Sequence, residues 1–463
     1  MPDHTYSIPI SDLSFHQQET NTWCAATCAQ MVLHYLSPHT APIDQDILRT
    51  NIENRAHALE PEIAWFGAPD GLEATLNAFN PSPPGGSFRL VACQTESEVS
   101  RHIVWSLERH HVPAIALVYG MRHWLVVRGY TADRMPLGPD DTGYQIRSFD
   151  LYDPWPPVPD RQPGHWPPPH VDGTDGCGSG NERGIVLNHI SYDGWRAAGG
   201  ILNSGYMTGI PADVTGSKWK GQFLAIVDPS DSDVPPGTSD SNPGKADDPP
   251  ASSSPPQYPA GRVSNHIALS TAMEALRQVA KERPDGWRDT LSGSSPRQPQ
   301  HIRAMRPAPS RAPAPETDTD ILRRSMMRPS VSELRHAPYY IVPFDQTGVT
   351  SAAVRVDSST GAYLQAVASQ DSSKSVVNMM SLADIANSLE GRRLDFDGTS
   401  VIFRKDEMDS DAPLGWKPCR ESMSPFYPFY IITLNTRSGA HELYVRAHDG
   451  AAFTHLEDNI AGA

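Results

Sequence analysis

The chain has 463 residues, 44 of them proline, and a formal net charge of −16. This length exceeds what one hydrophobic core usually serves, so we expect two or three domains. The acidic balance argues against nucleic acid or an anionic membrane surface as the main partner, because both bind to a concentrated basic surface.

The amino-terminal residues, MPDHTYSIPI, lack the basic start and the apolar stretch of a secretory signal peptide. No apolar run approaches the roughly 18 residues that span a bilayer. We therefore expect a protein that is made in the cytoplasm and has no membrane partner. Export by a route that reads no cleavable signal stays open.

The cysteines are few for a chain of this length, and their number is odd. This pattern disfavours a disulfide framework and leaves at least one free thiol. A thiol enzyme from a reducing compartment would show it, but so would a scatter of buried structural cysteines. The five are Cys24, Cys28, Cys93, Cys177 and Cys419.

The most informative segment runs from Gln18 to Tyr35, QETNTWCAATCAQMVLHY. A polar loop ends at Trp23, and apolar residues then recur at helical spacing, which predicts a helix that begins at Cys24. A thiolate at a helix start is stabilised by the positive end of the helix dipole, so Cys24 is a candidate nucleophile. Gln18, six residues earlier, is close enough to join the Cys24 backbone N–H in binding a developing oxyanion.

A predicted hairpin follows in VPAIALVYGMRHWLVVRGY, from Val112 to Tyr130. Two apolar runs flank the turn, and His123 opens the second strand, where its ring can face the helix that carries Cys24. The next strand, IRSFDLYDPWPP, offers Asp153 and Asp150 as carboxylates that could orient the imidazole. We favour Asp153 and expect Asp150 to face solvent.

The motifs around these residues resemble those of the papain-like cysteine peptidases. The resemblance rests on Gln18 with the Trp-Cys-Ala-Ala run at Cys24, on the HWLVVRGY strand at His123 and on the Asp-Pro-Trp run at Asp153. It points to the bacterial branch that resembles bacteriocin-leader (double-glycine) peptidases and related effector proteases. It implies an α+β domain with a helical amino-terminal part and an antiparallel sheet, and it implies no metal or organic cofactor.

The resemblance covers about Ser7 to Ile210, with apparent loop insertions at Pro139–Asp141 and Gln162–Glu182 and a weaker echo in ISYDGWRAAG near Tyr192. The chain departs from the pattern at Ala25, where many relatives have glycine. The added methyl group puts substrate preference in doubt more than catalysis.

Other interpretations of the same residues are weaker. A zinc cluster of Cys24, Cys28, His34 and His39 would need one helix to turn all of its ligands to the same side. Cys28 is better explained as a core residue one turn after Cys24. Cys177 lies in a Gly-rich stretch that lacks the lysine and the strand-to-helix setting of a phosphate-binding loop.

Composition divides the rest of the chain. We expect a hydrolase domain over residues 1–228, a Pro/Ser-rich linker over 229–262 and an isolated or docking helix over 263–291. A second Pro-rich linker is expected over 292–319, and a small α+β accessory domain over 320–463.

The accessory domain contains two similar units, from Pro338 and from Pro428, each with the pattern of strands joined by tight turns. The stretch MSLADIANSLEGRR between them predicts a helix. The first unit contains the motif V-D-x-x-T-G-x-Y, which resembles a motif of small secretion-associated domains that accompany bacterial proteases. The alternative is an unrelated adaptor domain.

The predicted function is a cysteine peptidase that hydrolyses amide bonds of a protein or peptide substrate through Cys24, His123, Asp153 and Gln18. The carboxy-terminal domain is a candidate intramolecular regulator. One alternative is an inactive papain-like module that binds peptides. Another is a delivered effector or toxin that uses the same triad for deamidation or acyl transfer.

Overall fold

The computed structural model describes most of the chain. Outside the described residues lie the predicted insertion Gln162–Glu182, with Cys177, and all of the first predicted linker except Arg262. The described residues are 3–20, 22–56, 65–80, 87–155, 185–196, 206–211, 214, 217–228, 262–283, 286–288, 293–305, 337–369, 375–396, 398–436 and 439–456.

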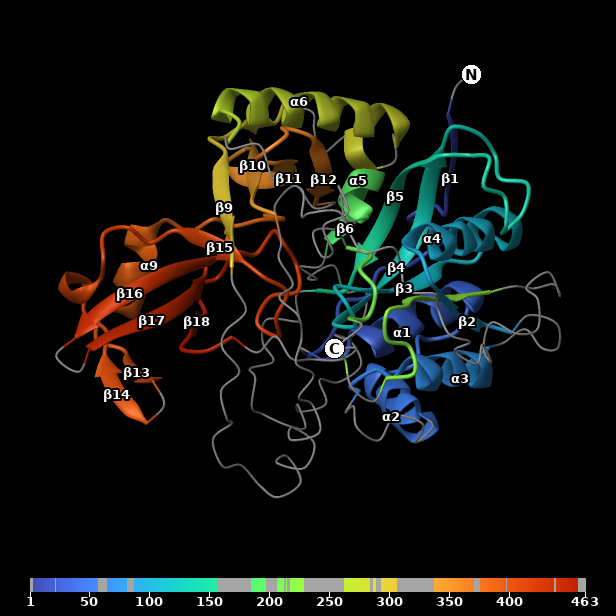
Figure 1. The fold of residues 1–463 in the computed structure, drawn as a ribbon, viewed down its shortest axis with the longest axis horizontal. Coiled ribbons are helices and arrows are strands. Elements are labelled where there is room, and N and C mark those ends of the chain that lie inside the picture. The colour runs from blue at the N-terminus through green and yellow to red at the C-terminus, as the bar shows by residue number, and fades with distance from the viewer. Residues whose placement is uncertain are drawn as a thin grey trace, which may run out of the picture.

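The amino-terminal half combines helices with strands that pair in antiparallel fashion (Figure 1). Its helices are α1 (Cys24–Leu36), α2 (Gln45–Arg55), α3 (Pro69–Phe79), α4 (Glu96–Trp105), the π-helical turn η1 (Ser106–His110) and α5 (Tyr192–Trp195). Its strands are β1 (His4–Ser7), β2 (Arg89–Cys93), β3 (Ala114–Val118), β4 (His123–Ala132), β5 (Ile146–Asp153), β6 (Ile185–Ser191) and β7 (Phe223–Val227).

The carboxy-terminal half contains the predicted helices and both strand-rich units. Its helices are α6 (Asn265–Glu282), α9 (Leu382–Leu389) and the 3-10 turn η3 (Lys405–Glu407). Its strands are β8 (Ser295–Pro296), β9 (Gln300–Ala304), β10 (Tyr339–Gln346), β11 (Val349–Asp357), β12 (Tyr363–Ala368), β13 (Arg393–Phe396), β14 (Thr399–Ile402), β15 (Leu414–Trp416), β16 (Phe429–Thr436), β17 (Gly439–Arg446) and β18 (Ala452–Phe453).

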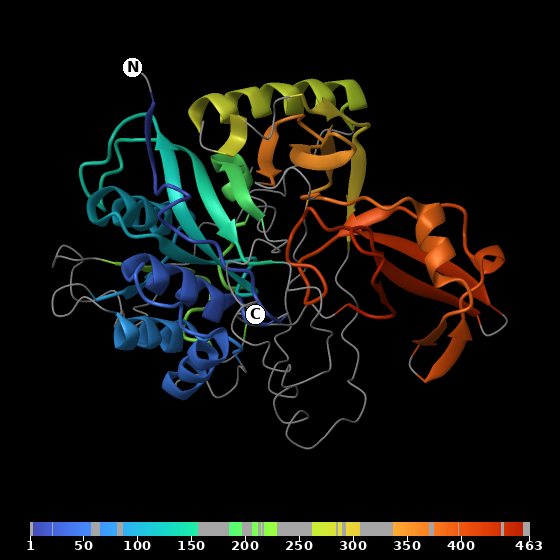
Figure 2. The same cartoon turned by 180° about the vertical axis from the view of Figure 1, so that it is seen from behind.

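One mostly antiparallel sheet runs through both halves. Its strand order is β18-β17-β16-β15-β9-β10-β11-β12-β6-β5-β4-β3-β7-β2, with a parallel pair between β15 and β9. The two halves meet where β12 pairs with β6. Figure 2 shows from behind how β16 and β17 lie at the opposite end of the molecule from α1–α3.

The prediction of a second linker over residues 292–319 is wrong for part of that range, because strands β8 and β9 lie inside it. Strand β9, QHIRA, has little apolar pattern to reveal it. Its backbone pairs with β10 through Tyr339↔Ile302, and a ladder of backbone hydrogen bonds forms whatever the side chains are.

Helix α6 docks on the sheet and is not isolated. The Ser264 side chain accepts a hydrogen bond from the Ile267 N–H and caps the helix, as serine commonly does. The buried face of α6 packs against β10, β11 and β12 (Figure 1). That face consists of Ala268, Ala272, Ala275, Leu276 and Val279.

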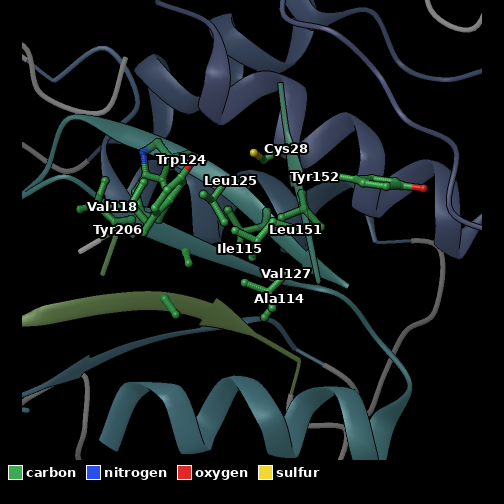
Figure 3. Packing of buried hydrophobic residues seen from close by; sticks show 14 of the residues in the cluster. Cys28, Ala114, Ile115, Val118, Trp124, Leu125, Val127, Leu151, Tyr152 and Tyr206 are labelled. Carbon is green, nitrogen blue, oxygen red and sulfur yellow. The ribbon is translucent and has the colours of Figure 1, made fainter. Parts of the chain in front are cut away.

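The amino-terminal sheet lies between α1 on one face and α4 on the other (Figure 3). Every residue of β3 and β4 is buried, as expected for strands that are covered on both faces. Cys28, a residue of α1, is buried against the strands that carry Leu125 and Leu151 (Figure 3). This core fixes the start of α1 against the end of the β3–β4 hairpin.

Candidate active site

Helix α1 begins at Cys24, as its sequence pattern predicts, and its alanines favour a helix that packs closely on the sheet. The Cys24 Sγ accepts a hydrogen bond from the Trp124 backbone N–H at 3.1 Å. This bond joins the first residue of α1 to the residue that follows His123 on β4. The nucleophile and the base predicted from the sequence are therefore brought together.

His123 is hydrogen bonded to Asp153. Its Nε2 lies 2.8 Å from Asp153 Oδ1, and both side chains are fully buried. Asp153 Oδ1 also accepts the Trp155 backbone N–H at 3.0 Å, which holds the carboxylate in place. Since Nε2 is used by Asp153, the other ring nitrogen, Nδ1, is left for the thiol.

The charge state of His123 is set by its neighbours. Burial alone would lower the pKa of His123, because it penalises the charged ring. The Cys24 and Asp153 charges act the other way, together with hydrogen bonding to both groups, and raise the pKa to about 10. Nδ1 has no hydrogen-bond partner within the described part of the chain, so it is left for the Cys24 thiol. The pair can therefore hold a protonated imidazole at neutral pH.

A strained turn delivers His123 to this position. Tyr119, Gly120 and Met121 have positive φ angles of 54°, 58° and 82°. The left-handed region is unfavourable for residues other than glycine, and such strain often gathers at functional sites. Arg122 closes the turn, since its Nη1 donates to the Tyr119 carbonyl at 2.9 Å.

Gln18 lies beside the end of β5. Its backbone N–H donates to the Pro154 carbonyl at 3.0 Å, so its loop is tied to the residue after Asp153. Its side-chain Nε2 donates one hydrogen to the Thr20 carbonyl at 2.7 Å. A primary amide has two N–H groups, and among the described residues only the Thr20 carbonyl accepts from this one, so the second N–H can donate to an oxyanion. The side chain is fully buried.

The sequence-based prediction that Asp150 faces solvent is wrong. Asp150 is 1% exposed and accepts hydrogen bonds from His189 Nδ1 at 2.9 Å and from Arg283 Nε. Side chains three residues apart on a strand point to opposite faces, so Asp150 and Asp153 serve different clusters. The Asp150 cluster ties the end of α6 to the amino-terminal sheet.

The zinc interpretation finds no support among the described residues, which contain no group of three or more metal-binding side chains. His34 Nδ1 is hydrogen bonded to His16 Nε2 at 3.0 Å, and His39 is exposed. Burial raises the pKa of the Cys28 thiol well above its usual value, as expected for a core cysteine.

Two neighbours of the site were not found from the sequence. The Tyr119 ring stacks on His123 with a centroid separation of 6.4 Å, and Trp416 of β15 meets Tyr119 edge-on at 5.6 Å. No local pattern marks Trp416, because it lies almost 300 residues further along the chain than Tyr119. A side chain of the carboxy-terminal half thus packs against the residue that stacks on His123.

Comparison with known proteins finds no matching family model, no matching curated protein and no matching solved structure. Within the described residues, no helix has both the length and the apolar character needed to cross a bilayer. The site's geometry is therefore the main basis for assigning a function.

Proposed function

We propose that this chain is a papain-like cysteine hydrolase that cleaves amide bonds of a protein or peptide. The observation that carries the proposal is the buried His123–Asp153 hydrogen bond, at 2.8 Å, next to the thiol at the start of α1. A nucleophile, a base within its reach and a group that orients the base are what covalent acyl transfer requires.

The reaction follows from these positions. His123 Nδ1 takes the proton of Cys24, and the thiolate attacks the carbonyl carbon to form a tetrahedral oxyanion. The Cys24 backbone N–H and Gln18 Nε2 would stabilise this charge. The C–N bond then breaks, His123 gives its proton to the leaving amine, and water hydrolyses the thioester by the same steps.

Peptide hydrolysis is one of several outcomes of this chemistry. If the carbonyl belongs to a glutamine side chain, the leaving group is ammonia and the reaction is deamidation. If an amine replaces water, the acyl group is transferred. A delivered effector that acts in another cell could use either reaction, and we place peptide hydrolysis first because the resemblance favours it.

One observation favours the alternative of an inactive peptide-binding module. The side chains of Gln18, Cys24, His123 and Asp153 are all fully buried, so a substrate cannot reach them in this conformation. The active-enzyme proposal therefore requires that the site open, and the contact of Trp416 with Tyr119 supports a role for the carboxy-terminal half in this step.

The test is alkylation of Cys24 by a limiting amount of iodoacetamide at pH 6, with the modified cysteine located by mass spectrometry. An ordinary thiol is mostly protonated at this pH, whereas a thiolate paired with imidazolium reacts. We expect Cys24 to be labelled selectively in the wild type and slowly in His123→Ala. Equal rates in both proteins would favour the binding module.

A further inference from the structure

Gln45 is a buried polar residue at the first position of α2, and its side chain is fully buried. Its Nε2 donates to the Gln17 carbonyl at 2.8 Å and to Gln30 Oε1 at 3.0 Å. Its Oε1 accepts the Glu19 backbone N–H at 3.0 Å and the Thr27 hydroxyl at 2.8 Å. Both hydrogens and both lone-pair directions of the amide are therefore used.

Two of these bonds bracket Gln18. The Gln17 carbonyl and the Glu19 N–H lie on either side of it in the chain, so the Gln45 amide fixes the backbone that carries the Gln18 side chain. Rotation of this backbone would displace the Gln18 side-chain amide. A displacement of about 1 Å at a catalytic group is enough to reduce a rate strongly.

The bond to Thr27 extends this restraint to the nucleophile. Thr27 lies on α1, close to one turn after Cys24, and its single hydroxyl hydrogen is shared between Gln45 Oε1 and the Trp23 carbonyl, each at 2.8 Å. One side chain thus connects the loop of Gln18 with the helix start that supplies the Cys24 N–H. These are the two proposed donors to the oxyanion.

Only glutamine meets these requirements at this position. Glutamate has no N–H to donate to the Gln17 carbonyl, and leucine can neither donate nor accept. Asparagine is one methylene shorter. Each of these replacements would therefore weaken or remove hydrogen bonds that Gln45 makes to buried or part-buried polar groups.

We propose that Gln45 is a positioning residue that holds Gln18 in register with Cys24 for oxyanion binding. This inference rests on the proposed function. Gln45 touches neither a substrate nor the reacting atoms and acts only through Gln18 and the start of α1.

The experiment compares two reactions of Cys24 in the full-length chain. Acylation by p-nitrophenyl acetate passes through an oxyanion, whereas displacement of iodide from iodoacetamide does not. We expect Gln18→Ala and Gln45→Leu each to slow acylation, on the order of a hundredfold for Gln18→Ala. The double variant should be no slower than Gln18→Ala, and alkylation should stay close to the wild-type rate in all three.

Gln30→Leu is the matched control. It removes bonds to Gln45 and to the Ile43 carbonyl, but it leaves the contacts of Gln45 with Gln17, Glu19 and Thr27 in place. Its acylation rate should stay near the wild-type rate. If Gln45→Leu does not fold, Gln45→Glu retains the shape and the acceptors and removes the donors, and the same pattern is expected.

Three results would overturn the inference: unchanged acylation in Gln45→Leu, losses that multiply in the double variant, or equal losses of acylation and alkylation. Failure of the proposed function is distinguishable, because it would appear in the wild type as alkylation that does not depend on His123. A wild type with His123-dependent alkylation but no acylation would remove the oxyanion role of Gln18, and the role of Gln45 with it.

Discussion

Asp153 and His123 share a hydrogen bond of 2.8 Å between two fully buried side chains, one at the end of β5 and the other at the start of β4. The bond directs His123 Nδ1 toward Cys24, and the carboxylate charge helps to raise the pKa of His123. The pairing therefore sets both the direction of the imidazole and its charge.

Asp153→Asn should reduce alkylation of Cys24 at pH 6 by about tenfold. Loss of the carboxylate charge lowers the pKa of His123, and less imidazolium means less thiolate at that pH. The rate should recover as the pH is raised toward 9, where an ordinary thiol reacts. A pH profile that matches the wild type would show that Asp153 has only a structural role.

Trp416→Ala should make Cys24 accessible. Trp416 packs against Tyr119, which stacks on His123, and an aromatic pair of this kind contributes about 0.5–1.5 kcal/mol, so alkylation should rise by up to about tenfold. The buried Cys28, Cys93 and Cys419 serve as internal controls for unfolding. Labelling that rises equally at all four cysteines would contradict a local closing contact.

Arg283→Met should destabilise the fold by about 3–5 kcal/mol, because it removes the ion pair that Arg283 forms with the buried Asp150 carboxylate. Urea unfolding at pH 7 measures this loss. Asp150→Asn combined with Arg283→Met should restore part of it, since no buried charge is then left unpaired. A loss below about 1 kcal/mol would mean that water reaches Asp150.

The same cluster predicts sensitivity to acid. Burial would raise the pKa of Asp150, but the Arg283 charge and the His189 hydrogen bond outweigh it and hold the pKa well below the usual range. Its stabilising contribution is therefore complete above the unfolded value of about 4 and is lost as the pH falls below that value. Urea midpoints between pH 5 and pH 2 should fall less steeply in Asp150→Asn than in the wild type.

His16 predicts a second pH effect at milder acidity. Burial, followed by the charge of His34, lowers the pKa of His16 to about 3, so the folded chain keeps it neutral. The unfolded chain takes up this proton below about pH 6.5, and stability is lost from there downward, by about 2 kcal/mol at pH 5. His16→Gln should remove this part of the slope. An unchanged slope between pH 7 and pH 5 would show that His16 is hydrated.

Local patterns in the sequence were sufficient for the elements that carry the candidate site. Helical periodicity placed the start of α1 at Cys24, and two apolar runs around a turn placed His123 at the start of β4. The helix over Asn265–Glu282 was also predicted, because its alanines recur on one face. Such features depend on residues within a few positions of each other.

Tertiary structure alone decided which distant groups meet. The choice between Asp153 and Asp150 depends on which strand face each occupies and on Arg283, far along the chain. The pairing of β12 with β6 uses backbone groups that every residue possesses, so no residue type in the sequence predicts this pairing. Gln45 became significant only when folding placed its amide between the loop of Gln18 and α1, since a single polar residue at a helix start has no pattern that identifies its partners.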